Sequence, residues 1–178
     1  MTAFVALLRA VNVLGTGKLP MTELKSMCEI AGFQSVRTYI ASGNVVFQSR
    51  KKEAQVKAIL EASLLAYSGK PVAALVRTAE EMAAVLAANP YADHPGDRTV
   101  AFFLDHAPQQ SDLDCVSKLT NERLSLGTRE IYVAYPDGIG QSRLNLPAAR
   151  LGTARNMNTI AKLAQMAADL QNDKLRKR

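Results

Sequence analysis

The sequence contains no tryptophan, only two cysteines and two histidines, and few aromatic residues of any kind. No stretch reaches the roughly 20 consecutive apolar residues that a membrane-spanning helix needs. Cys28 and Cys115 belong to no CxxC motif, so we expect two buried free thiols. The apolar segment 2–13 has neither a basic leader nor a small-residue cleavage site. We therefore interpret it as a strand and expect a cytoplasmic protein.

Positive charge is in modest excess, and much of the excess lies at the C-terminal end of the chain. The chain has a formal charge of +6, to which the four basic residues in 174–178 contribute +4, so residues 1–173 retain +2. We expect 174–178 to be a basic disordered tail. A hydrophobic content of 48% and a length of 178 residues are typical of a globular protein with a core.

The first 78 residues follow the order strand, helix, strand, strand, helix, strand. Apolar runs at 3–11 and 72–77 predict buried strands, and helical spacing of apolar residues predicts helices from about 20 to 31 and from 52 to 67. The segment 37–47 predicts a hairpin that turns at Ser42-Gly43-Asn44, because Gly and Asn tolerate positive φ. The order is that of a ferredoxin-like split βαβ unit, and the predicted fold class is α+β.

Residues 79–173 predict a second, degenerate α+β unit, packed with the first as one globule. A capping box at 78–81 opens a helix, and a strand over 99–104, a helix over 111–119 and strands over 123–126 and 130–135 follow. Residues 136–150 are predicted to be irregular, and a last helix runs from 157 to 170. The order of elements echoes the first unit, although no residue-level repeat is visible.

Three segments of the chain resemble a bacterial family, domain of unknown function 1697. They are residues 7–21 (LLRAVNVLGTGKLPM), 32–47 (GFQSVRTYIASGNVVF) and 153–159 (TARNMNT). The resemblance implies an α+β cytosolic protein without an assigned activity. From the residues themselves we expect no cofactor and no catalytic residue.

Polar residues at the predicted loop and hairpin end form the candidate site. Arginine presents a planar fork of donors suited to phosphate or carboxylate, and asparagine offers both a donor and an acceptor. Backbone N–H groups at the start of a helix also attract anions. The same side chains could instead satisfy loop backbone, and an asparagine near 156 could simply cap the last helix. The candidate ligand-binding residues are Arg9, Asn12, Lys18, Arg37, Tyr39, Ser42, Asn44, Arg155 and Asn156.

Several familiar chemistries are not supported by the sequence. The loop ending at Lys18 fails the Walker pattern, because Asn12 replaces its first glycine and Leu19 its Ser or Thr. His94 and His106 lie far apart in loops, so no metal site is expected. No G-x-S-x-G elbow is present. The first strand carries apolar residues on both faces, which argues against an aromatic RNA-binding platform.

Three hypotheses remain. The leading one is a non-enzymatic protein that binds an anionic ligand, first of all nucleic acid or nucleotide, at the polar end. The second is an enzyme for a small phosphorylated or carboxylated metabolite, with Arg37 orienting the substrate and Tyr39 as acid or base. The third is a structural or interaction module, for example a homodimer through a sheet edge. No membrane partner is expected.

Overall fold

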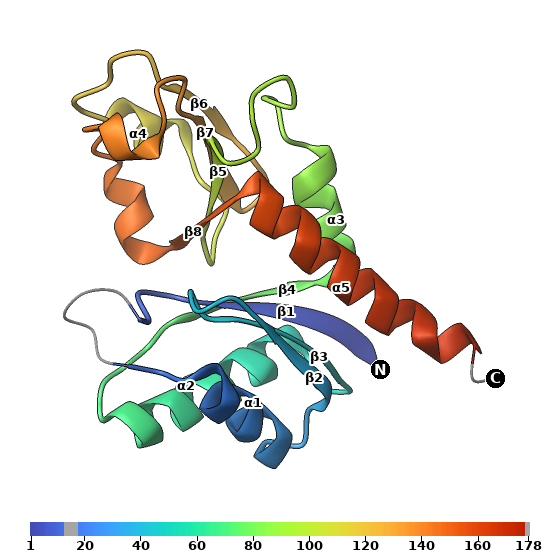
Figure 1. Cartoon of the computed structure of the whole chain (residues 1–178). Coiled ribbons are helices and arrows are strands. Elements are labelled where there is room, and N and C mark those ends of the chain that lie inside the picture. The colour runs from blue at the N-terminus through green and yellow to red at the C-terminus, as the bar shows by residue number, and fades with distance from the viewer. Residues whose placement is uncertain (13–17, 177–178) are drawn as a thin grey trace. The chain divides into compact units, whose positions relative to one another are not determined.

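A computed structural model describes residues 1–12 and 18–176, with side chains described as far as Asn172. The chain divides into two compact units, one made of Met1–Ala83 with Lys162–Arg178 and the other of Ala84–Ala161. Each unit contains its own antiparallel four-stranded sheet (Figure 1). The predicted second unit, 79–173, differs from this division, because the last part of the final helix belongs to the first unit.

Unit 1 has the predicted order of elements. They are β1 (Thr2–Leu8), α1 (Met21–Ile30), β2 (Gln34–Tyr39), β3 (Asn44–Ser49), α2 (Glu53–Ser68), β4 (Ala74–Thr78) and the first part of α3 (Ala79–Ala87). The strands lie in the order β2-β3-β1-β4, all antiparallel. This is the arrangement of a ferredoxin-like sheet, in which the βαβ crossover is split by the hairpin strand.

Both faces of this sheet are buried. On one face, alternate residues of the strands, such as Phe4 and Phe47, pack against α1 and α2 (Figure 1). On the other face Val5 and Val46 are also buried, as expected for a strand without apolar–polar alternation. Tyr67, the last residue of the predicted helix over 52–67, is exposed.

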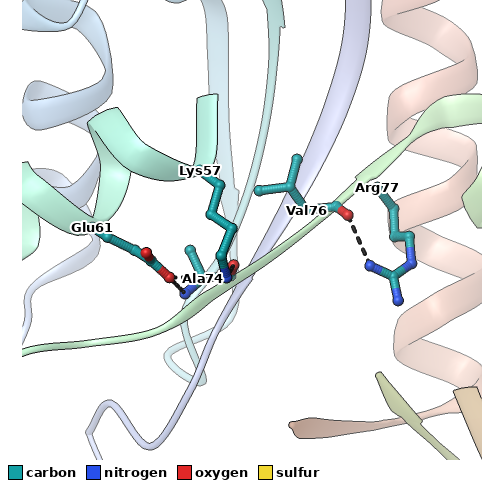
Figure 2. A network of polar contacts seen from close by, with 5 residues as sticks. All are labelled: Lys57, Glu61, Ala74, Val76 and Arg77. Atoms are coloured by element: carbon teal, nitrogen blue, oxygen red, sulfur yellow. Dashed lines mark hydrogen bonds and ion pairs between the residues drawn. The ribbon is translucent and has the colours of Figure 1, made fainter. Parts of the chain in front are cut away.

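The free edge of β4 is closed by side chains (Figure 2). The Lys57 Nζ donates to the Ala74 carbonyl at 2.8 Å, and the Ala74 N–H donates to Glu61 Oε1 at 3.0 Å. Lys57 and Glu61, one turn apart on α2, also form an ion pair of 3.0 Å. The carbonyl of Val76, two residues after Ala74, accepts a hydrogen bond of 2.9 Å from Arg77 Nη1. Backbone groups that an edge strand would otherwise expose are thus bonded within the chain.

Unit 2 repeats the same sheet with shorter helical connections. It contains β5 (Thr99–Phe103), α4 (Gln110–Asp114), β6 (Arg123–Leu126), β7 (Glu130–Ala134), the 3-10 turns η1 (Ile139–Gln141) and η2 (Pro147–Leu151), β8 (Thr153–Asn156) and the start of α5 (Met157–Arg176). Its strand order is β6-β7-β5-β8. The sequence prediction missed β8, whose four residues include only one apolar side chain.

Three further predictions differ from the structure: the helix over 111–119, the burial of Cys115 and the disordered tail. The helix expected over 111–119 ends at Asp114, and Cys115 takes its C-cap position. As a result Cys115 is exposed, whereas Cys28 on α1 is buried as expected. The last helix continues through Arg176, so 174–176 belong to a helix and not to a disordered tail. Residues 177–178 lie outside the described residues.

The equivalence of the two sheets extends to individual residues. Arg77 on β4 pairs across from Val5 of β1, and Arg155 on β8 pairs across from Ala101 of β5. Each arginine is buried and donates from Nη1 to the carbonyl of the residue before it. The residue that follows caps a helix in both units, through Glu81 N to Thr78 Oγ1 and Thr159 N to Asn156 Oδ1. This repeat supports an internal duplication.

Candidate functional site

The polar end of unit 1 is built by the β2–β3 hairpin and the end of β1. The hairpin loop spans 40–43, and Asn44 is already the first residue of β3. Gly43 has the predicted positive φ of 84°, but the other positive φ belongs to Ile40 and not to Asn44. The Leu8 N–H donates to the Gly43 carbonyl at 2.8 Å, which fixes the hairpin to β1.

Asn44 and Ser42 hold the hairpin together from inside. The Asn44 side chain is fully buried, and its Nδ2 donates to the Tyr39 carbonyl and to Ser42 Oγ, both at 2.9 Å. Tyr39 lies opposite Asn44 in the strand register and is half-buried. The amide of Asn44 therefore bonds the backbone and the serine of its own turn. Satisfying loop backbone was the structural alternative to ligand binding that the sequence left open for this residue.

Asn12 clamps two loops to each other. Its Nδ2 donates to the carbonyls of Leu19 and Ala41, each at 2.8 Å, and its Oδ1 accepts the Leu19 N–H at 2.7 Å. The amide therefore joins the entry of α1 to the hairpin. Residues 13–17, which include most of the glycine-containing loop before Lys18, lie outside the described residues.

Arg9 and Lys18 at this end, and Arg37 within β2, are three cations without such a structural role. Arg9 is half-buried, and Lys18 and Arg37 are exposed. Within the described residues, none of the three guanidinium or ammonium groups makes a hydrogen bond or an ion pair. Lys70, which follows the C-cap of α2, is a fourth exposed cation at the same end and was missed by the sequence analysis. Nothing in its local sequence marked it, because only the antiparallel course of α2 brings it there.

The strand register gives the distance between the Cα atoms of Arg9 and Arg37. Arg37 is opposite Val46, which is opposite Val5, so Arg37 is level with the middle of β1 and two strands away from it. Arg9 lies four residues beyond Val5. With about 4.8 Å between strands and about 3.3 Å per residue, the two arginine Cα atoms are about 16 Å apart. The cations thus form an extended surface and not a tight cluster.

Arg155 and Asn156 belong to unit 2 and have structural partners. Arg155 is 7% exposed, and its Nη1 donates to Thr153 Oγ1 and to the Ala154 carbonyl, both at 2.8 Å. Burial lowers the pKa of its guanidinium to about 10, which still leaves it charged at neutral pH. Asn156 Oδ1 accepts the Thr159 N–H at 2.9 Å and caps α5. The capping interpretation of this segment is therefore correct.

Charge is distributed unevenly between the units. Unit 1 contains 15 basic and 8 acidic residues, a formal charge of +7, whereas unit 2 contains 7 basic and 8 acidic residues, a formal charge of −1. Residues 174–178 contribute +4 of the charge of unit 1, so the rest of the unit, which carries Arg9, Lys18 and Arg37, has a formal charge of +3. Among the described residues, no helix is both long and apolar enough to cross a membrane.

Comparison with known proteins identifies a family but no activity. Residues 1–132 match the family described as "Protein of unknown function (DUF1697)", and the chain belongs to that family. Among solved structures, a conserved bacterial protein, SP0830 from Streptococcus pneumoniae, is similar in fold. It is 24% identical in sequence, with a TM-score of 0.78 over 93% of this chain and 98% of that one. No curated protein matches the chain.

Proposed function

We propose that this member of the DUF1697 family binds the phosphate backbone of a nucleic acid through the cationic end of unit 1. The observation that carries the proposal is a set of three cations, Arg9, Lys18 and Arg37, that make no hydrogen bond or ion pair within the described part of the chain. Unpaired, solvated cations on a unit of charge +7 attract polyanions through counterion release.

The spacing of the cations favours an extended ligand over a small one. A separation of about 16 Å corresponds to roughly five nucleotides along one strand of a duplex, at about 3.4 Å each. The enzyme hypothesis needs Arg9 and Arg37 on one small substrate, and a Cα separation of about 16 Å supports this less well than a polymer with charges along its length. The engaged amides of Asn12 and Asn44 support the loops that hold Arg9 and Lys18.

Binding of fluorescein-labelled 20-nucleotide RNA and of a 20-base-pair DNA duplex, followed by fluorescence anisotropy, tests the proposal. The wild-type protein should bind at low salt and lose affinity steeply with added NaCl. The triple variant Arg9→Gln, Lys18→Gln, Arg37→Gln should flatten the plot of log K against log salt by about two to three units. A folded wild-type protein that binds neither probe at low salt would refute the proposal.

A matched control removes the same charge from the opposite end of the sheet. Arg50, Lys51 and Lys52 follow β3, whose last residue is opposite Thr2 at the start of β1. The triple variant with Gln at 50, 51 and 52 should retain most of the wild-type salt dependence. If it loses as much affinity as the first variant, or if deletion of 174–178 alone abolishes binding, the attraction is not specific to the proposed end.

A further inference from the structure

Unit 2 has a polar hollow that lies outside the proposed nucleic-acid surface. The segment before β6 and the segment after β7 line it, so residues around 120–122 and 135–142 meet there. The hollow opens to solvent, and the volume that a small group can occupy in it is about 40 Å³. A single water molecule needs roughly 10–15 Å³ by the same measure. The hollow therefore suits a small head group and not a whole metabolite.

Glu122 forms one wall of the hollow and is held as a carboxylate. Its Oε2 accepts the Thr120 N–H at 2.8 Å and the Thr120 hydroxyl at 3.0 Å, and its Oε1 accepts the Ser142 hydroxyl. These hydrogen bonds, that from Ser142 first, lower the pKa of Glu122 to about 2. A carboxylate has about four acceptor positions. The N–H of Glu122 itself is a fourth donor to this carboxylate, so its acceptor positions are engaged and it acts on a ligand through its charge.

Tyr135 supplies a hydroxyl that has no hydrogen-bond partner among the described residues. Its side chain is 6% exposed and lines the hollow, and its hydroxyl makes no hydrogen bond to any described residue. Every fully buried side-chain nitrogen or oxygen of the described residues does have a partner. The Tyr135 hydroxyl is therefore not sealed in the core but reaches accessible space. Burial and then the charge of Glu122 raise its pKa to about 12, so it stays a neutral phenol at physiological pH.

The charge of the hollow is negative. Asp137 adds a second carboxylate, and its Oδ2 accepts a hydrogen bond of 2.6 Å from Asn121 Nδ2. No lysine or arginine lines the hollow. The neighbouring Arg123 lies over the ring of Tyr91, 5.4 Å from its centroid. Within the described residues, no group of three His, Cys, Asp or Glu side chains gathers as a metal site. These features select an organic cation that donates several hydrogen bonds.

We propose that the hollow between Glu122 and Tyr135 binds the ammonium group of a small primary amine. The N–H groups of such a cation would donate to the Tyr135 oxygen and to Asp137, and the charge of the Glu122 carboxylate would attract it. The site is independent of the proposed nucleic-acid surface, since it lies in the other unit and takes a ligand of opposite charge.

Titration of ¹⁵N-labelled protein with ethylammonium chloride, followed by amide chemical shifts, tests the site. Shifts should be confined to residues 120–122 and 135–142, and should be absent with tetramethylammonium chloride, which has no N–H donor. Equal responses to the two salts, or no response to ethylammonium up to 100 mM (about the weakest binding worth assigning), would refute the proposal.

The variant Tyr135→Phe separates binding from folding. The hydroxyl has no partner among the residues that the structure describes, so its removal should leave the melting temperature unchanged and weaken ethylammonium binding about tenfold. Asp137→Asn should also weaken binding. Tyr67→Phe, at an exposed tyrosine of α2, is the matched control and should have no effect. Unaltered affinity in a folded Tyr135→Phe protein would overturn the assignment.

Discussion

Replacement of Gly43 by alanine tests how tightly the hairpin is docked on β1. Gly43 has a φ of 84°, and a Cβ at this position would lie against the Val11 side chain and 2.9 Å from the Leu8 Cβ. The left-handed backbone costs an L-residue about 1–2 kcal/mol, and forced overpacking costs about 1–3 kcal/mol. Together they predict a loss of about 2–5 kcal/mol, a large part of the 5–15 kcal/mol by which most domains are stable.

Urea unfolding of Gly43→Ala and Gly32→Ala measures the two contributions separately. Gly32 has a φ of 83°, nearly the same backbone, but an added Cβ would meet no atom within 4 Å. Gly32→Ala should therefore show only the backbone cost of about 1–2 kcal/mol. Equal losses in the free energy of unfolding for the two variants would refute the close approach of Gly43 to β1.

Three further predictions follow from local contacts. Asn156→Ala should lower the free energy of unfolding by about 0.5–2 kcal/mol in urea titrations, because the N-cap of α5 is lost, and Asn156→Ser should restore most of it. The pKa of Glu122 is about 2 in the folded protein, below the usual value of about 4.3 in the unfolded chain. Its contribution to the free energy of unfolding is therefore complete above about pH 4.3 and is lost as the pH falls toward 2. Glu122→Gln should flatten stability curves between pH 2 and 5, and an unchanged curve would contradict the hydrogen-bonded carboxylate. Burial, with a smaller contribution from a neighbouring glutamate, raises the pKa of Cys28 to about 12, so a thiol reagent should modify only the exposed Cys115 in the native protein and both cysteines in urea.

The first unit could be predicted from sequence because its elements carry strong local signals. Continuous apolar runs, helical spacing and Gly43 in the turn each specify one local structure, and all agree with the ferredoxin-like order. The second unit lacks these signals. The four residues of β8 show no alternation, and α4 is a single short turn, so neither could be separated from loop. The equivalence of Arg77 and Arg155 appears only once strand register is known.

The polar end was found from sequence, but the roles of its residues could not be. Asn12 and Arg9 are both polar residues after an apolar strand. Only the structure shows that the Asn12 side chain is bonded to two loops, while the Arg9 guanidinium has no partner in the described part of the chain. The hollow of unit 2 was missed because Glu122, Tyr135 and Ser142 are distant in sequence and form no motif. Their convergence depends on where two irregular segments meet, which local patterns do not encode.

The side chains that cover β4 also limit how this sheet can polymerise. A fibre that grows by strand addition needs two sheet edges with unpaired backbone groups on every molecule, so that each molecule can pair with one neighbour on either side. The carbonyl and N–H of Ala74 on the edge strand β4 are already bonded within the chain. A molecule that paired with a neighbour through its other edge strand, β2, would therefore offer no second free edge of this sheet, and the assembly would end there.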